Sequence, residues 1–229
     1  MHGVLSFAVE DSSVHKTRWA GVGVALAIGL AQGAAHAQLA SRPAAEWKAT
    51  LEAPARVEGL KIEQVVKALK LKDGDVVADL GAGTGLFEPQ LAYAVGTRGR
   101  VYAVEIDKGF LDEIDRKVDE LHISSIETVL GAPTDPKLPT RSVDVALMHD
   151  VLHHVEQRQA YLKAVSTYLK PTGRIAVVEF HAKDSPHKSD PALIVSKEQG
   201  AALMAEAGFM PAEEVALFQD KWFVIYKRQ

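Results

Sequence analysis

The segment from Asp79 to Gly85, with the sequence DLGAGTG, carries three glycines at alternate positions between a short apolar run and a helical pattern. Glycine at such a turn lets the backbone bend tightly and approach a ligand where a side chain would collide. The first N–H groups of the following helix have no partner inside the helix and can bind a ligand. We therefore predict a ligand-binding loop made of Asp79, Gly81, Ala82, Gly83, Thr84 and Gly85.

The spacing of these glycines argues against two common nucleotide-binding motifs. A dinucleotide fingerprint needs G-x-G-x-x-G, but here the third glycine comes one residue early and Leu86 holds its place. A phosphate-binding P-loop needs four residues between its glycines and then Lys-Ser/Thr. About 20 residues beyond the loop, Glu105 ends a predicted strand, where a carboxylate can accept hydrogen bonds from both hydroxyls of a ribose. We expect a nucleoside ligand that contacts Glu105 and Ile106, the alternative for Glu105 being an ordinary exposed carboxylate.

A second group of polar side chains lies in the sequence HDVLHH, at the end of the predicted fourth strand. In an open α/β sheet the carboxyl ends of the strands face the ligand crevice. The first residue, His149, is expected in the cofactor site. The candidates for catalysis, as a base or in aligning the substrate, are Asp150, His153 and His154. Second-rank candidates at the end of the fifth strand are Glu179 and His181. The alternatives are a packed histidine at 153 and a carboxylate at 150 that only holds the loop.

The histidines also raise the possibility of a metal site. His149 and His153 are four residues apart and would share one face of a helix, as in the zinc motif H-E-x-x-H. Asp150 stands in place of the glutamate, however, and His149 is predicted to end a strand, which breaks the helical spacing. His181 and His187 in the later loop add only slightly to this reading. We predict no metal.

The elements that would position these residues alternate between strand and helix patterns. The predicted strands are 76–80, 101–106, 126–131, 143–149 and 174–180, and the predicted helices are 61–70, 86–95, 108–122 and 156–169. This alternation is typical of βαβ units in a mostly parallel sheet. A helix over 197–209 follows, and two strands at 213–218 and 222–227, three residues apart, predict an antiparallel hairpin. Residues 38–74 are expected to form an N-terminal extension with a helix, and residues 75–229 one α/β domain.

The sequence VVADLGAGTG resembles motif I of the class I S-adenosylmethionine-dependent methyltransferases, and LKPTGR at 169–174 resembles a turn of the same family. The resemblance covers about residues 60–229 and is closest to the small-molecule and quinone-precursor enzymes. It implies a Rossmann-like seven-stranded methyltransferase sheet, mostly parallel with an antiparallel C-terminal hairpin strand. It also implies S-adenosyl-L-methionine as the cofactor, with Asp79 supporting the glycine loop or contacting the amino group of the methionine part.

One position departs from the family pattern. Many relatives have Asp-Ala after the third strand, where the aspartate binds the adenine amino group, but Gly131-Ala132-Pro133 stands here. The resemblance then implies that adenine is recognised by the backbone at Gly131 and Ala132, or by Thr134 or Asp135. The sequence leaves these alternatives open.

Residues 1–37 have the pattern of a cleavable signal peptide. Lys16 and Arg18 precede an uncharged stretch over 19–37, which ends in Ala35-His36-Ala37, an A-x-A cleavage pattern. We expect export to the periplasm after cleavage. The alternatives are a membrane anchor over 19–37, for which the stretch is short and rich in glycine, and a disordered tail or a start codon assigned too early.

The overall composition argues against several classes of function. A formal charge of −4 provides no basic field for nucleic acid, and the absence of cysteine excludes disulfides, thiolate metal ligands and a cysteine nucleophile. We expect a methyltransferase acting on a small-molecule acceptor. Because the methyl donor is already activated, such an enzyme has mainly to align the acceptor in a dry pocket. The alternatives are a non-catalytic exported binding protein on the same fold and a nucleotide-dependent oxidoreductase, which the glycine spacing disfavours.

Overall fold

The computed structural model describes residues 44–229. Three helices precede the sheet: α2 (Ala44–Leu51), α3 (Pro54–Gly59) and α4 (Ile62–Ala68), the last of which confirms the helix predicted at 61–70. Within residues 44–229, no helix has the length and apolar character needed to cross a membrane. The predicted signal peptide and its cleavage site lie outside the described residues.

Seven strands form one sheet in the order β3-β2-β1-β4-β5-β7-β6. Their bounds are β1 Val76–Leu80, β2 Arg100–Glu105, β3 Ile126–Leu130, β4 Val143–His149, β5 Leu169–Phe180, β6 Phe209–Glu214 and β7 Lys221–Arg228. Strands β1 to β5 pair in parallel, whereas β7 runs antiparallel to both β5 and β6. This confirms the predicted seven-stranded, mostly parallel sheet with an antiparallel C-terminal strand. The order reverses between β1 and β4, which is where open α/β sheets bind ligands.

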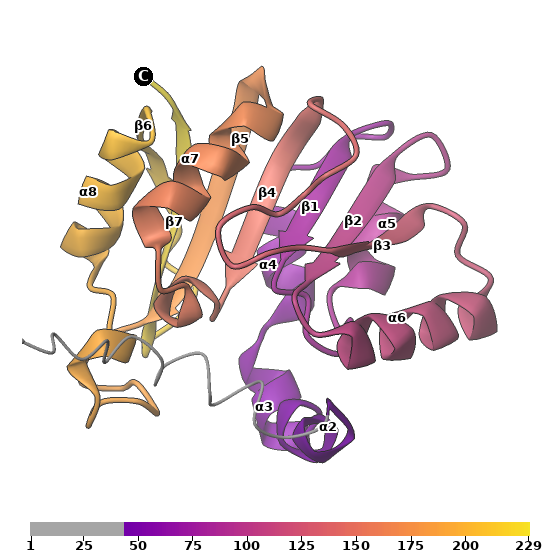
Figure 1. Ribbon diagram of the computed structural model, residues 1–229, viewed down its shortest axis with the longest axis horizontal. Coiled ribbons are helices and arrows are strands. Elements are labelled where there is room, and N and C mark those ends of the chain that lie inside the picture. Colours follow the sequence, from indigo (N-terminus) through magenta and orange to yellow (C-terminus); the bar gives the residue numbers. More distant parts are fainter. Residues whose placement is uncertain (1–43) are drawn as a thin grey trace, which may run out of the picture. The chain divides into compact units, whose positions relative to one another are not determined.

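Helices cover both faces of the sheet (Figure 1), and their bounds are α5 Glu88–Val95, α6 Lys108–Leu121, α7 Arg158–Tyr168 and α8 Lys197–Glu206. Successive residues of a strand point to opposite faces. Ala146 and Met148 of β4 accordingly join the core beneath α7 and α8, while Val145 and Leu147 join the core beneath α4, α5 and α6. These two apolar layers hold the strand ends in fixed positions.

The predicted position of the sixth strand is wrong. The pattern predicted a strand at 213–218, but β6 covers Phe209–Glu214 and follows α8 directly. Gly208, with a φ of +88°, provides the turn that a residue with a side chain rarely adopts. Strand β6 lies at the edge of the sheet, where Pro211 is tolerated, and residues after Phe209 are exposed. The apolar residues whose pattern predicted a strand, including Leu217 and Phe218, lie in a loop and pack against the core.

The fifth strand is longer than predicted. It begins at Leu169 rather than Arg174, so the predicted turn at 169–174 lies inside its span. The pairing with β4 shifts there: Val143 lies opposite Leu169, and Val145 lies opposite Arg174. Four residues of β5 therefore loop out of the pairing.

Candidate functional site

The glycine loop between β1 and α5 forms the predicted tight turn, with left-handed backbone at Gly81, Gly83 and Gly85, whose φ values are +80°, +57° and +78°. A Cβ atom on Gly81 would lie 2.6 Å from a methyl carbon of Val151, and one on Gly85 would lie 2.8 Å from a side chain of α6. The same atom on Gly83 would meet nothing closer than 3.8 Å. Two of the glycines are therefore needed for packing, whereas Gly83 is the open point of the loop.

Glu105, the last residue of β2, is hydrogen-bonded to the backbone of Gly83 in this loop. Its Oε1 accepts a hydrogen bond from the N–H of Gly83 at 2.8 Å, and its Oε2 accepts one from the N–H of Ile106 at 2.9 Å. Burial raises the pKa of the Glu105 carboxyl, and these N–H groups oppose the rise by stabilising the charged form. The neighbouring Ile106 side chain is 55% exposed, although it is apolar. The structure thus brings the predicted loop and the predicted strand-end carboxylate into direct contact.

A pair of buried carboxyls lies at the base of the loop. Asp79 is the second-last residue of β1, Glu88 begins α5, and the two residues are 3% and 2% exposed. Burial raises the pKa of Asp79 to about 7, the charge of Glu105 adds to this rise, and the side-chain contact with Glu88 opposes it. Burial also raises the pKa of Glu88 well above its usual value, and the charge of Asp79 adds to that rise. Thr84 is also buried, and its carbonyl accepts a hydrogen bond from Lys117 of α6 at 2.7 Å. These buried residues support the glycine loop from the interior of the protein.

The residues predicted for adenine recognition form a tight turn after β3. The N–H of Gly131 donates to the carbonyl of Glu105 at 2.8 Å, and Ala132 and Asp135 exchange backbone hydrogen bonds of 2.7 and 3.1 Å. The Asp135 carboxylate accepts bonds from the Tyr168 hydroxyl and the Lys137 N–H. Asp135 therefore has a structural role in this turn, which sits beside the glycine loop because β3 and β2 are neighbours.

At the end of β4 the predicted His149 and Asp150 have different surroundings. The His149 ring packs between Phe87 and Phe218, with centroids 5.1 and 5.9 Å away. Asp150 has a φ of +58°, and its Oδ2 lies 2.7 Å from the ammonium of Lys221 and 3.4 Å from His149 Nδ1. Burial alone would raise the pKa of Asp150, but His149 and Lys221 together hold it below the usual range. A carboxylate paired in this way is a weak base.

His153 and His154 lie in the short helix η1 (Leu152–His154), next to residues from two other segments. Glu179 of β5 accepts a hydrogen bond from the His153 N–H at 3.1 Å, and its other oxygen lies 2.6 Å from His153 Nδ1. The His153 ring is 4.0 Å from that of His154 and 5.2 Å from that of His187. Burial, followed by the charges of the other two histidines, lowers the pKa of His154 to about 3. The ring of His153 therefore lies beside those of His154 and His187, whereas His149, at the strand end as expected, packs against Phe87 and Phe218.

Sequence reasoning missed several residues that complete this region. Lys221 lies 71 residues from its partner Asp150 and is buried, with no local pattern to mark it. From the N-terminal extension, Arg56 is close enough to Asp150 for that charge to oppose the lowering of the Arg56 pKa by burial. Lys61 donates to the carbonyl of Leu217 at 2.8 Å. The segment before the domain is thus part of the site region.

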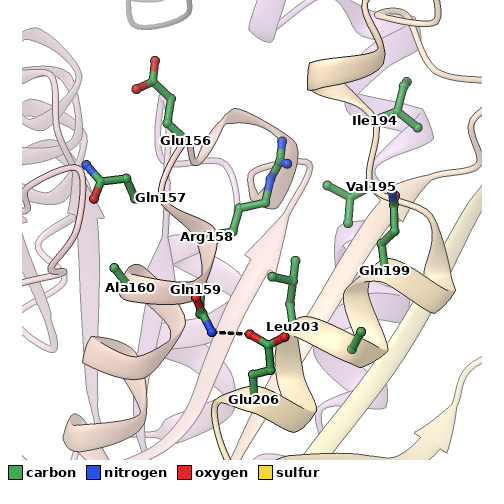
Figure 2. A pocket seen from close by; sticks show the side chains of 11 residues that line it. Glu156, Gln157, Arg158, Gln159, Ala160, Ile194, Val195, Gln199, Leu203 and Glu206 are labelled. Atoms are coloured by element: carbon green, nitrogen blue, oxygen red, sulfur yellow. Dashed lines mark hydrogen bonds between the residues drawn. The ribbon is translucent and has the colours of Figure 1, made fainter. Parts of the chain in front are cut away.

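A separate groove of about 620 Å³ lies between the start of α7 and helix α8. Figure 2 shows its lining residues, where Gln159 of α7 donates a hydrogen bond to Glu206 of α8. None of the predicted site residues lines this groove. It is distinct from the region around the glycine loop.

Comparison with known proteins agrees with this geometry. A family model described as "Methyltransferase domain" matches residues 78–177. A demethylmenaquinone methyltransferase of Lactobacillus johnsonii is 29% identical over 121 residues, which are 52% of this chain and 50% of that protein. The chain spans about half the length of the curated relatives it matches.

Solved structures share the fold over a longer stretch. A SAM dependent methyltransferase from Aquifex aeolicus superposes with a TM-score of 0.73 and 24% identity, over 81% of this chain and 98% of that one. A 1,6-didemethyltoxoflavin-N1-methyltransferase of Burkholderia thailandensis, solved with bound 1,6-didemethyltoxoflavin and S-adenosylhomocysteine, superposes with a TM-score of 0.62 and 18% identity, over 81% of this chain and 84% of that one. The family match over residues 78–177, with the glycine loop and the strand order β3-β2-β1-β4-β5-β7-β6, shows that the chain contains a methyltransferase domain with the fold of the S-adenosylmethionine-dependent methyltransferases.

Proposed function

We propose that this protein transfers a methyl group from S-adenosyl-L-methionine to a small-molecule acceptor. The observation that carries the proposal is the contact between the open glycine, Gly83, and the strand-end carboxylate Glu105 at the reversal of the strand order. The same position in other open α/β sheets holds a nucleoside ligand. Small-molecule acceptors are favoured by the negative net charge and by the relatives, which include quinone-precursor and toxoflavin-precursor enzymes.

The residues of the loop fit such a cofactor. A Cβ atom on Gly83 would meet no protein atom closer than 3.8 Å, so a ligand can approach the backbone there where a side chain would block it. Glu105 has two carboxylate oxygens at the strand end and can accept hydrogen bonds from ribose hydroxyls. The exposed Ile106 side chain provides an apolar surface for a base, next to the turn at Gly131 and Ala132. The cofactor supplies an activated methyl group, so the chain has mainly to bind and orient it.

The acceptor side of the site is proposed at the end of β4. Asp150, His153 and His154 lie beyond the strand, at the edge of the sheet where β1 carries the glycine loop. Because Lys221 and His149 keep Asp150 charged, we assign Asp150 to orienting the acceptor and shaping the electrostatic field, rather than to removing a proton. An acceptor that is already nucleophilic needs no base from the protein.

The glycines of the loop test this proposal. Gly83→Ala places its methyl group 3.8 Å from Leu51 without a collision. We therefore expect S-adenosylhomocysteine affinity to fall by at least tenfold, while the free energy of unfolding changes by only about 1 kcal/mol, the cost of a left-handed alanine. Gly81→Ala is the contrasting variant, because its methyl group collides with Val151 and should lower stability first. Calorimetric titration with S-adenosylhomocysteine measures the affinity, and NAD is the control ligand. Wild-type protein that binds NAD in preference to S-adenosylhomocysteine would contradict the proposal.

Turnover separates an enzyme from a binding protein. Incubation of the protein and labelled S-adenosyl-L-methionine with a panel of phenols, quinols and amines should transfer label to a class of acceptor. Tight S-adenosylhomocysteine binding without transfer to any acceptor in cell extracts would favour the non-catalytic binding protein.

We also propose that residues 1–37 act as a cleavable signal peptide and that the mature protein works in the periplasm. The proposal rests on the basic residues, uncharged stretch and A-x-A pattern of the sequence.

A further inference from the structure

Three histidines from two separate segments converge beyond the end of β4. His153 and His154 belong to η1, and His187 belongs to the loop after β5. One ring nitrogen from each lies within 4.8 Å of the others. Imidazole nitrogens suit zinc, copper, iron and nickel, and three histidines with a fourth open position are a common zinc site. We propose that His153, His154 and His187 bind one divalent transition-metal ion of the zinc type.

The best argument for a built site is the partner of His153. Glu179 is 2% exposed, and its Oε2 lies 2.6 Å from Nδ1 of His153, which leaves Nε2 free to bind an ion. Histidines that bind metals generally give their other nitrogen to a carboxylate or carbonyl, which fixes the ring and increases its basicity. Glu179 also accepts a bond from the His153 backbone N–H, so the ring and the chain are both oriented by one carboxylate.

A second argument is that Arg158 holds the two segments together. Its guanidinium donates to the carbonyls of Leu152 and His153 in η1 at 3.0 and 2.8 Å. It also donates at 2.6 Å to the carbonyl of Ala192, in the short helix η2 (Pro191–Leu193) that follows His187. The backbone N–H of His187 in turn donates to the Ser185 hydroxyl at 3.0 Å. Arg158 thus joins the two segments through backbone carbonyls, without contacting the imidazoles.

The fourth position would be taken by an oxygen ligand such as water, since the cluster consists of three side chains. A part in methyl transfer would rest on the proposed function, because the cluster lies next to Asp150 on the acceptor side. Binding of the ion itself does not depend on that function. It can therefore be tested without cofactor or acceptor.

The test uses tag-free protein treated with a chelator and then dialysed. Calorimetric titration with Zn²⁺ should show one tight equivalent, and Co²⁺ should give the visible absorption of a four-coordinate ion. His154→Gln and His187→Gln should each weaken Zn²⁺ binding by more than about a hundredfold, and Glu179→Gln by about tenfold to a hundredfold, the range for a supporting carboxylate. His122→Asn is the control, because His122 is an exposed histidine that ends α6 with a φ of +55°, which asparagine tolerates.

The outcomes separate this proposal from the methyltransferase one. A folded wild-type protein without a stoichiometric Zn²⁺ or Co²⁺ site would overturn it, and so would affinity unchanged in both His154→Gln and His187→Gln. Circular dichroism and thermal unfolding establish that each variant is folded. S-adenosylhomocysteine is titrated into the same metal-free samples. If the protein binds S-adenosylhomocysteine but has no metal site, only the metal proposal is refuted. If it has a metal site but does not bind S-adenosylhomocysteine, only the cofactor proposal is refuted.

Discussion

At the scale of single residues, Glu105 combines two tasks that can be separated by substitution. Its carboxylate holds the Gly83 N–H in the present structure and is proposed to accept the ribose hydroxyls. Glu105→Ala should weaken S-adenosylhomocysteine binding by about 1–3 kcal/mol, the cost of losing charged hydrogen bonds in a site built for them. Glu127→Ala, an exposed glutamate on β3, is the matched control. Affinities of the two variants within a factor of two would make Glu105 an ordinary surface carboxylate.

The ion pair between Asp150 and Lys221 makes a different prediction at this scale. Both side chains are at most 10% exposed, so removing one leaves a buried charge without its partner. Lys221→Met should lower the free energy of unfolding by about 3–5 kcal/mol. Lys227→Met, on the exposed part of the same strand, should change it by less than about 0.5 kcal/mol. Urea unfolding monitored by tryptophan fluorescence measures both variants, and an equal effect on them would show that the pair is unimportant.

How well the sequence predicts this site depends on the distance between partners along the chain. The loop from Asp79 to Gly85 and its contact with Glu105 were predictable, because spacing and strand ends are local signals. The pairing of Lys221 with Asp150 was not, because it depends on where the last strand enters the sheet. His187 was noted only as a histidine in a polar loop; its place beside His153 follows from the folded path of that loop.

At the scale of elements, the same reasoning explains why the sixth strand was misplaced. The segment 215–218 has the apolar composition of a strand, yet Gly208 turns the chain so that the strand begins at Phe209. Once β6 is positioned, Phe218 is placed next to His149 and Lys221, where its ring contributes to the site. Composition identified an apolar segment, but only the pairing partner decides which residues join the sheet.

The junction of β1 and α5 predicts a pH dependence of stability. Asp79 has a usual pKa of 3.8, which burial raises to about 7 in the folded protein, and the pKa of the neighbouring Glu88 is raised well above its usual value by burial and by the charge of Asp79. The folded state therefore binds more protons than the unfolded state between about pH 4 and pH 7, and stability from this pair falls as pH rises through that window. Glu88→Gln removes one of the two carboxyls and should flatten this part of the profile, so that at pH 8 it unfolds several degrees higher than wild type.

The control for this prediction is Glu63→Gln, which removes a glutamate from the first turn of α4 at an exposed position. It should reproduce the wild-type profile. Thermal unfolding of the three proteins at pH 5 and pH 8 gives the comparison. A Glu88→Gln profile that falls as steeply as that of wild type would show that the pair shares no proton.

At the scale of the whole molecule, the last prediction concerns export, and it falls on residues outside the described range. If residues 1–37 form a signal peptide, cleavage after Ala37 leaves Gln38 as the first residue of the mature protein. The described structure begins at Ala44, where α2 already contacts the domain: Lys48 pairs with Glu113 of α6, and Glu52 of the same segment accepts a bond from Lys117 at 2.6 Å. Cleavage after Ala37 would leave these contacts intact.

We therefore expect the protein recovered from its native host to start at Gln38, to lie in the periplasmic fraction, and to unfold at the same temperature as a recombinant chain that starts there. Mass spectrometry of the intact protein gives the first residue, and an osmotic-shock extract gives the compartment. Ala35→Leu together with Ala37→Leu should block cleavage, because the cleavage site requires small residues. An intact N-terminus on wild-type protein in the membrane fraction would support the anchor, and one in the cytoplasm would refute export. Because S-adenosylmethionine is made in the cytoplasm, a periplasmic location would also require that the cofactor be supplied from there.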